Sequence, residues 1–308
     1  MSFNMSLNTT EPPPHTDASK LNTKNTRIAL SLLSVLISVI GLFGNGIIIS
    51  YLCRRANRNK STVYILNLAV ADFIFLVGCG SVAVYLLCLL NGVQTADEAD
   101  KVFSILMDLV NNFGFNASLF LLATLSTERC LSGYYPIWYR CRRPRHLSAV
   151  VCVVMWTLSL LITVLEKFVF EDYRSTIYII TSVLYVIVTI IMIMTSSVLL
   201  WEICRSSSIN RPVRLYIAII AAVILFLVSL VPARLMRLLF FFVIIPTGPI
   251  KVLTYFVVSL CSAVNSCFNP YIYILVGRWR NRSSMKLALH GVFKEEIERS
   301  SELCLTTG

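Results

Sequence analysis

Seven long runs of apolar residues, joined by short polar connections, dominate this sequence of 308 residues. A helix needs about 20 mainly apolar residues to cross the hydrocarbon core of a membrane, and each run is close to that length or longer. The runs cover residues 28–52, 61–90, 102–127, 147–165, 176–204, 213–245 and 249–276. Because backbone groups in lipid must bond to one another, we expect each run to form a helix. The short alternating segments typical of a membrane β-barrel are absent from the sequence.

The composition excludes the soluble alternatives. Hydrophobic residues make up 56% of the chain and charged residues 14%, against about 45–50% and 25% in soluble domains. The mean hydropathy is +0.75. A globule of this size would still expose much of its surface, and the chain has too few polar residues to cover it. The same numbers exclude a disordered chain, so the sequence predicts an all-α membrane protein with seven transmembrane helices.

The basic residues are divided unevenly between the two sets of connections. The larger set holds Arg54, Arg55, Arg58, Lys60, Arg129, Arg140, Arg142, Arg143, Arg145, Arg205, Arg211, Arg214, Arg278, Arg280, Arg282 and Lys286. The smaller set holds Lys20, Lys24, Arg27, Lys101, Lys167, Arg174 and Lys251. Positive residues beside spans stay in the cytoplasm, so we expect the N-terminus outside and the C-terminus inside. The net charge of +11 then faces anionic lipid and an intracellular partner, and a nucleic-acid partner is not expected.

This orientation divides the chain into four parts. Residues 1–27 read as a disordered extracellular tail, in which Asn4 and Asn8 begin glycosylation sequons. Residues 28–276 form the seven-transmembrane domain. Residues 277–293 have the pattern of a short amphipathic helix on the inner leaflet. Residues 294–308 form a cytoplasmic tail, where Cys304 is a candidate for palmitoylation.

Polar residues within the apolar runs are costly in lipid and are candidates for function. Asp72 lies in the second run, Ser118 in the third, Asn45 in the first, and Asn265 in the seventh. One interpretation is that each makes an interhelical bond that only holds the bundle together. Four runs that supply such residues at compatible depth favour the other interpretation, a shared polar core.

With seven spans and an outer N-terminus, these motifs resemble those of the rhodopsin-like G-protein-coupled receptors. The matching residues are Asn45, 68–72, 128–130 in the place of the family's Asp-Arg-Tyr, Trp156, Pro232 and 269–273. Residues 128–132 and 135–146, with Trp156 and residues 165–166, are similar to the Mas-related subfamily, and within it to the H-type receptors. The resemblance covers roughly residues 28–290. It implies a receptor that passes an extracellular signal to a heterotrimeric G protein of the Gq or Gi class, with arrestin as a further partner.

The chain departs from the usual pattern of that family at several positions. The cysteine that ties the third span to the second outer loop is replaced by Ser104, so an outer disulfide is not expected. Leu230 replaces the usual tryptophan before Pro232. Asn111 replaces the aspartate of amine receptors, which makes an amine-transmitter receptor a poor interpretation.

The resemblance also implies which residues switch the receptor and which hold an ion. Arg129, held at rest by Glu128, would be released toward the G protein, while spans six and seven swing about Pro232 and Pro270. Asn269 and Tyr273 would supply the other moving part. Sodium, as a negative allosteric modulator, would be held by Asp72, Ser118, Asn265, Ser266 and Asn269; a sodium-free hydrogen-bonded cluster is the alternative. No other cofactor is expected.

The expected ligand is a short peptide or another small charged molecule. In related Mas-type receptors a glutamate of the fourth span helps bind cationic ligands, and Glu166 stands at that place; alternatively it pairs with Lys167 or a nearby arginine. Asp108 and Asn111 are further candidate ligand residues. Two arginines three residues apart in span six, Arg234 and Arg237, share a helical face and would receive an anionic group, or else pair with Glu166 or Asp108. A transporter or channel is the alternative class, but no internal repeat supports it.

Overall fold

The computed structural model describes residues 15–54, 60–92, 97–135, 137–144, 146–168, 171–205, 217–228 and 249–278, and the regular structure in these ranges is helical. The helices are α1 (His15–Cys53), α2 (Lys60–Leu90), α3 (Asp97–Tyr134), α4 (Leu147–Phe168), α5 (Glu171–Arg205), α7 (Pro249–Arg278) and the apolar helix Ile217–Val228, with a π-helical turn η1 (Trp138–Arg142). Five of them are long and apolar enough to cross a membrane. Each of these α-helices overlaps one of the predicted apolar runs, which supports the all-α prediction.

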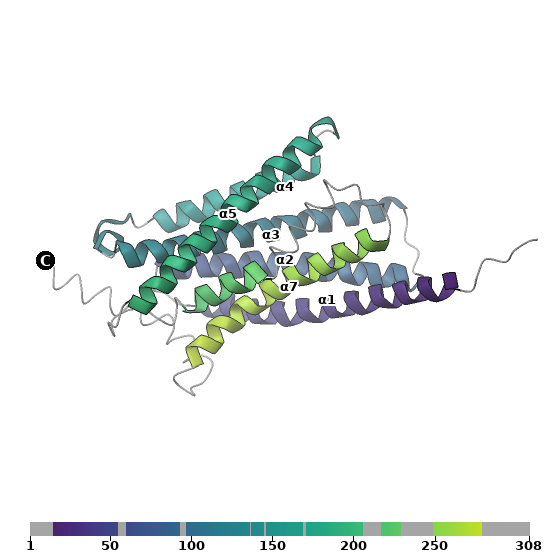
Figure 1. Ribbon diagram of the computed structural model, residues 1–308, viewed down its shortest axis with the longest axis horizontal. Helices are drawn as coiled ribbons and strands as arrows, with labels where there is room; N and C mark the ends of the chain where they lie inside the picture. Colours follow the sequence, from purple (N-terminus) through teal and green to yellow (C-terminus); the bar gives the residue numbers. More distant parts are fainter. Residues whose placement is uncertain are drawn as a thin grey trace, which may run out of the picture.

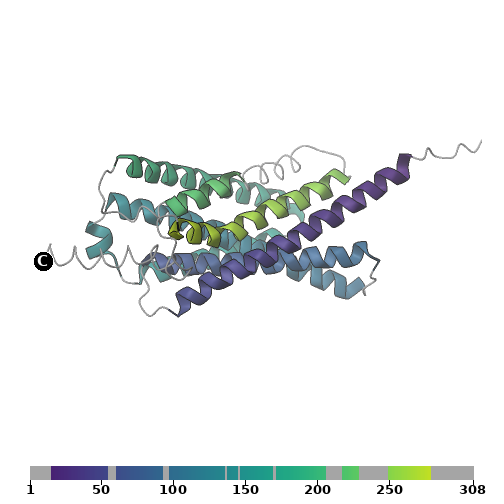
Figure 2. The same cartoon turned by 90° about the horizontal axis from the view of Figure 1, so that it is seen from below.

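The helices pack side by side in an elongated bundle with α3 at its centre. In Figure 1, α3 lies between α2 on one side and α4 and α5 on the other, and it packs against all three. On the far side of α2, α1 packs against α2 and α7, and Figure 2 shows α1 crossing the bundle beside α7. Side chains from α3 can therefore meet partners on most of the other helices.

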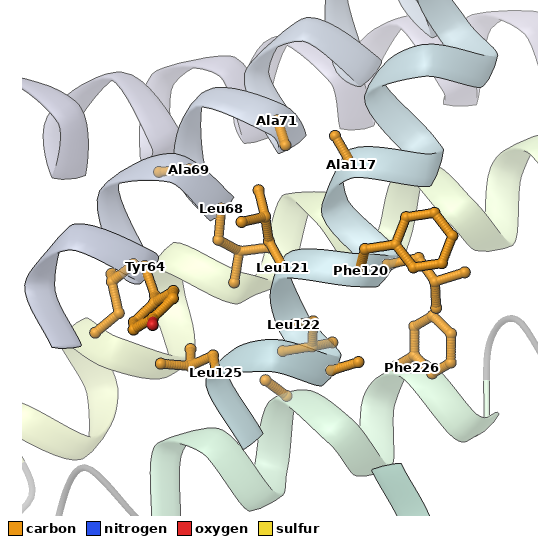
Figure 3. Close-up of a cluster of buried hydrophobic side chains, with 14 of the residues drawn as sticks. Tyr64, Leu68, Ala69, Ala71, Ala117, Phe120, Leu121, Leu122, Leu125 and Phe226 are labelled. Carbon is orange, nitrogen blue, oxygen red and sulfur yellow. The ribbon is translucent and has the colours of Figure 1, made fainter. Parts of the chain in front are cut away.

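Large apolar side chains lie both inside the bundle and on its outer surface. Inside, Leu121, Leu122 and Leu125 of α3 pack between Leu68 of α2 and Phe226 of the helix Ile217–Val228 (Figure 3). Outside, the faces of α1, α4 and α5 expose many large apolar side chains, such as Val153 at 60% and Met194 at 62% exposure. Apolar surface on this scale is unfavourable in water and favourable in lipid.

Two glycines let the backbones of α2 and α3 touch. A Cβ atom on Gly114 would lie 2.5 Å from the backbone nitrogen of Phe75, and one on Gly78 would lie 2.9 Å from that of Asn111. The contacts are reciprocal, since each helix gives one glycine and receives one. Small residues allow helices to approach this closely in membranes.

Several helices extend past the predicted boundaries. α1 begins at His15, so residues 15–27 of the predicted disordered tail are helical, while the apolar span itself covers Lys24–Cys53. α3 begins at Asp97 and ends at Tyr134, outside the predicted 102–127. Hydropathy indicates where lipid begins, whereas a helix ends where its backbone hydrogen bonds end, and the two need not coincide. The predicted inner-leaflet helix beyond Arg278, Cys304, Asn4 and Asn8 lie outside the described residues.

Candidate functional site

Glu166 stands in a hydrogen-bond network that joins α3, α4 and α5. The Tyr185 hydroxyl lies 2.8 Å from Asn116 Oδ1 and 3.2 Å from Glu166 Oε1. The Asn116 amide donates to Thr163 Oγ1 at 3.1 Å, and Thr163 donates its own proton to the Ser159 carbonyl. A tyrosine hydroxyl has one proton, and its contact to Asn116 is shorter than its contact to Glu166. The hydrogen bond to Glu166 is therefore the weaker of the two. Its carboxylate therefore keeps acceptor capacity for another donor.

The second acid at this end of the bundle already has a cationic partner. Lys167 Nζ lies 2.6 Å from Asp108 Oδ2, and Asn112 donates to Asp108 Oδ1 at 3.1 Å. Lys167 thus pairs with Asp108 of α3, and the suggested pairing of Lys167 with Glu166 is wrong. Asn111 lies on α3 at the close approach to α2, with its backbone beside Gly78.

Part of the predicted ligand site cannot be placed. Arg234, Arg237 and Pro232 lie outside the described residues, and so does Leu230. Their pairing with Glu166 or Asp108, or with an anionic ligand group, remains a prediction. The described cysteines, with Cys88 and Cys261 among them, are free thiols.

A second polar cluster lies in the middle of the bundle around Asp72, whose side chain is fully buried. Ser118 of α3 donates to Asp72 Oδ1 at 2.6 Å, and Asn269 of α7 donates to Asp72 Oδ2 at 2.8 Å. Asn45 of α1 donates to the Ser266 carbonyl at 3.1 Å, and the Ser266 side chain also bonds to Asp72. Three helices thus meet at one carboxylate, and α1 joins the cluster through the Ser266 carbonyl, as the interpretation of a shared polar core requires.

The donor set of this cluster is compatible with a small hard cation. Within the described part of the chain, Asn265 Oδ1, Asn269 Oδ1 and the Tyr273 hydroxyl are buried without a hydrogen-bond partner. Buried oxygens normally find a partner, and hard cations are bound by oxygen ligands. Sodium therefore fits the residues present, with Asp72 supplying the charge.

At the opposite end of the bundle from Glu166, Glu128 has partners in the connection that follows α3. Glu128 forms an ion pair with Arg143, and its Oε1 accepts a hydrogen bond of 2.7 Å from the Tyr139 hydroxyl. The role in which Glu128 restrains Arg129 stays a prediction.

Arg129 of α3 and Tyr273 of the α7 motif are both buried. Arg129 is 1% exposed and Tyr273 is 2% exposed, and Tyr273 lies within electrostatic range of Arg129. Pro270 is inside α7, next to Gly44 of α1, where a Cβ atom would lie 2.9 Å from the proline ring. Of the predicted switch residues, Arg129 and Tyr273 thus influence each other electrostatically, and Pro270 packs against α1.

Sequence reasoning missed several members of these clusters. Tyr185 lies in an apolar run and was not singled out, although a buried tyrosine usually finds a partner for its hydroxyl. Arg143 and Tyr139 belong to the stretch that resembles the Mas-related subfamily, and nothing local in the sequence indicates their contacts with Glu128. Trp156, taken as a family marker, donates its indole N–H to Asn67 Oδ1 at 2.9 Å and so links α4 to α2.

Comparisons with known proteins match this arrangement. The family described as "7 transmembrane receptor (rhodopsin family)" matches residues 44–176. The chain is 34% identical to "Proto-oncogene Mas" of Rattus norvegicus over 276 residues, which is 85% of this chain and 82% of the relative. It is 35% identical to "Mas-related G-protein coupled receptor member B2" of Mus musculus over 300 residues, 93% and 85% of the two chains. It is 36% identical to "Mas-related G-protein coupled receptor member X2" of Homo sapiens over 299 residues, 92% and 89% of the two chains.

Proteins of this family are multi-pass receptors of the plasma membrane that couple an extracellular ligand to a G protein, and they are not enzymes. The transporter or channel alternative is thereby excluded. With relatives this similar over most of its length, and with α3 packed against α2, α4 and α5 at the centre of the bundle, the chain belongs to the rhodopsin family of G-protein-coupled receptors, in the branch of Mas and the Mas-related receptors.

Proposed function

We propose that this receptor recognises an extracellular ligand with a cationic group, such as a short peptide, through the carboxylate of Glu166. The proposal rests on one observation: two acids at the same end of the bundle differ in whether a cation already pairs with the carboxylate. Asp108 is neutralised by Lys167 at 2.6 Å, whereas the hydrogen bond to Glu166 from the described part of the chain is a 3.2 Å contact from a shared tyrosine proton. A ligand cation gains most where the carboxylate is least satisfied, because a charge-assisted hydrogen bond is roughly twice as strong as a neutral one.

The remaining parts of the proposal rest on the sequence and on the family. Arg234 and Arg237 would receive an anionic group such as a peptide carboxylate, which arginine binds bidentately. Asn111 would line the same site. Placement in the H-type group rests on the motif around residues 128–146. Glycosylation at Asn4 and Asn8 would mark the outer tail.

On the cytoplasmic side, we propose that Arg129 engages a G protein of the Gq or Gi class, with arrestin as a later partner. Displacement of Tyr273, Asn269 and Pro270 on α7 would accompany this step, with Pro232 as the second kink. Sodium bound at Asp72, Ser118, Asn265, Ser266 and Asn269 would favour the resting arrangement, because it would hold α2, α3 and α7 together.

The experiment uses a library of short basic peptides and analogues in which each arginine is replaced by neutral citrulline. Calcium and cAMP readouts in cells that express the receptor identify active peptides and the G-protein class. Glu166→Gln should lower the potency of a basic hit by about 10- to 100-fold, as expected for the loss of a charge-assisted bond, and should change that of its citrulline analogue little.

The matched control is Asp108→Asn, which neutralises an acid at the same end that already has a partner. We expect Asp108→Asn to change the potency of the same peptides by no more than about threefold, the size of an exposed ion pair. Equal losses for the basic peptide and its citrulline analogue in Glu166→Gln would rule out charge recognition by Glu166.

A further inference from the structure

A chain of hydrogen bonds joins α3, α4 and α5 beside Glu166, and its direction follows from where each proton goes. Thr163 donates its hydroxyl proton to the Ser159 carbonyl at 2.8 Å, so its oxygen is left to accept from the Asn116 amide at 3.1 Å. The amide nitrogen of Asn116 therefore faces Thr163, and its Oδ1 faces Tyr185. Because an amide oxygen can only accept, the Tyr185 hydroxyl is the donor in the 2.8 Å contact between them.

The Tyr185 hydroxyl also lies 3.2 Å from a second acceptor, Glu166 Oε1. Tyr185 and Asn116 are buried, and hydrogen bonds are electrostatically stronger in the protein interior than in water. A bond to an ionised acceptor is roughly twice as strong as a neutral one, so the charge of Glu166 attracts the proton although Asn116 is nearer. One proton cannot bond fully to both acceptors, and the bond to Asn116 is therefore weaker than it would be beside a neutral group.

α3 and α5 are linked a second time, ten residues farther along each helix, where Ser126 Oγ lies 2.7 Å from Thr195 Oγ1. In both links the two partners are 69 residues apart in the sequence. The two helices therefore run parallel and keep one register at two levels about 15 Å apart. The first link lies beside Glu166, and the second lies about one helical turn before Arg129. A change at the first link can thus reach the end of α3 that carries Arg129.

We propose that Tyr185 is a positioning residue that makes the bond between α3 and α5 depend on the presence of a cation at Glu166. This role rests on the proposed function, in which Glu166 receives the cationic group of a ligand. A cation at the carboxylate lowers its attraction for the Tyr185 proton, so the hydroxyl bonds fully to Asn116 and holds α5 more firmly against α3. Tyr185 thus passes the arrival of a charge at α4 to the helix that carries Arg129.

A test without any ligand measures how strongly Tyr185 and Asn116 are coupled, and how that coupling depends on Glu166. The midpoint of thermal unfolding of the full-length receptor in detergent is measured for Tyr185→Phe, Asn116→Leu and the double variant, with Glu166 present and in the Glu166→Gln background. The non-additivity of the two changes isolates their bond. We expect it to be about 2–4 °C in the Glu166→Gln background, the size of one hydrogen bond, and at most about half as large with Glu166 present.

The matched control is the second link between the same two helices. Ser126→Ala and Thr195→Val should show the same non-additivity in both backgrounds, because this link lies about 15 Å away along α3. Glu166→Leu serves as a second background, since leucine accepts no hydrogen bond in any orientation, and should give the same large coupling as Glu166→Gln. Equal coupling of Tyr185 and Asn116 with and without the carboxylate would overturn the proposal.

A signalling test uses the basic peptide obtained from the library. Tyr185→Phe keeps the ring and the Glu166 charge, so a labelled copy of the peptide should bind within about threefold of its wild-type affinity. The maximal response should fall by about half or more, since one hydrogen bond shifts a two-state equilibrium roughly fivefold. Tyr173→Phe makes the same change on α5 at an exposed residue and should keep both values. A full maximal response in Tyr185→Phe, or a loss of affinity and response together, would contradict the proposal.

The two tests separate this role of Tyr185 from the proposed function. If Glu166→Gln weakens the basic peptide and its citrulline analogue equally, Glu166 does not recognise ligand charge and the proposed function fails. The unfolding experiment uses no ligand and decides independently whether Glu166 and Asn116 share the Tyr185 proton. If Glu166 recognises charge but the coupling is the same in every background, the ligand site stands and Tyr185 does not relay its occupancy.

Discussion

Gly114→Ala should push α2 and α3 apart and destabilise the receptor. The new Cβ atom would lie 2.5 Å from the backbone nitrogen of Phe75 and 2.7 Å from its Cα, whereas non-bonded carbon atoms prefer about 3.5–4.0 Å. The obstructing atoms belong to backbone and cannot rotate away, so the helices must separate by roughly 1 Å at this contact. Overpacking of this kind costs about 1–3 kcal/mol, and the better helix propensity of alanine offsets about 1 kcal/mol of it.

Gly46→Ala is the matched control. Gly46 also lies inside a helix, on α1, but a Cβ atom there would meet nothing within 4 Å. Both variants make the same change in helix propensity, so the difference between them isolates the steric conflict. We expect the midpoint of thermal unfolding in detergent to fall for Gly114→Ala and to stay level or rise for Gly46→Ala. If the two variants unfold at the same temperature, the backbones of α2 and α3 are farther apart at Gly114 than these distances require.

Two further outcomes are expected from the polar contacts. Asp72→Asn should abolish any difference in G-protein binding between NaCl and choline chloride, because it removes the only charge among the proposed sodium ligands; a difference that persists in the variant would place the ion elsewhere. Trp156→Phe should lower the free energy of unfolding by about 1–2 kcal/mol, since the Asn67 amide oxygen loses its 2.9 Å bond from the indole. Unchanged stability would mean that another donor replaces the indole.

The spans and the central cluster could be predicted because their signals are local. Each apolar run is long enough to mark its own helix, and Asp72, Ser118 and Asn269 each stand out as polar residues in such a run. Helices of similar length that cross the same layer bring residues of similar depth together, so their meeting at Asp72 follows from their positions in the runs.

The contacts that could not be predicted depend on features with no local signal. The pairing of Glu128 with Arg143 depends on the path of the chain after α3, which hydropathy does not describe. Gly114 is one of several glycines within apolar runs, and only the packing of α2 against α3 distinguishes it from Gly46. Tyr185 is one of many large residues in an apolar run, and only the packing of α3, α4 and α5 brings Asn116 and Glu166 to its hydroxyl.

The ion pair between Lys167 and Asp108 has a consequence for how firmly the bundle is closed at the Glu166 end. Receptors of this family commonly fasten that region with a covalent bond, but Ser104 stands at the corresponding position of α3. Here α3 and α4 are joined by charges that are about one third exposed, and water and salt ions weaken such contacts. A disulfide is insensitive to salt, whereas the contact between Lys167 and Asp108 weakens as the ionic strength rises.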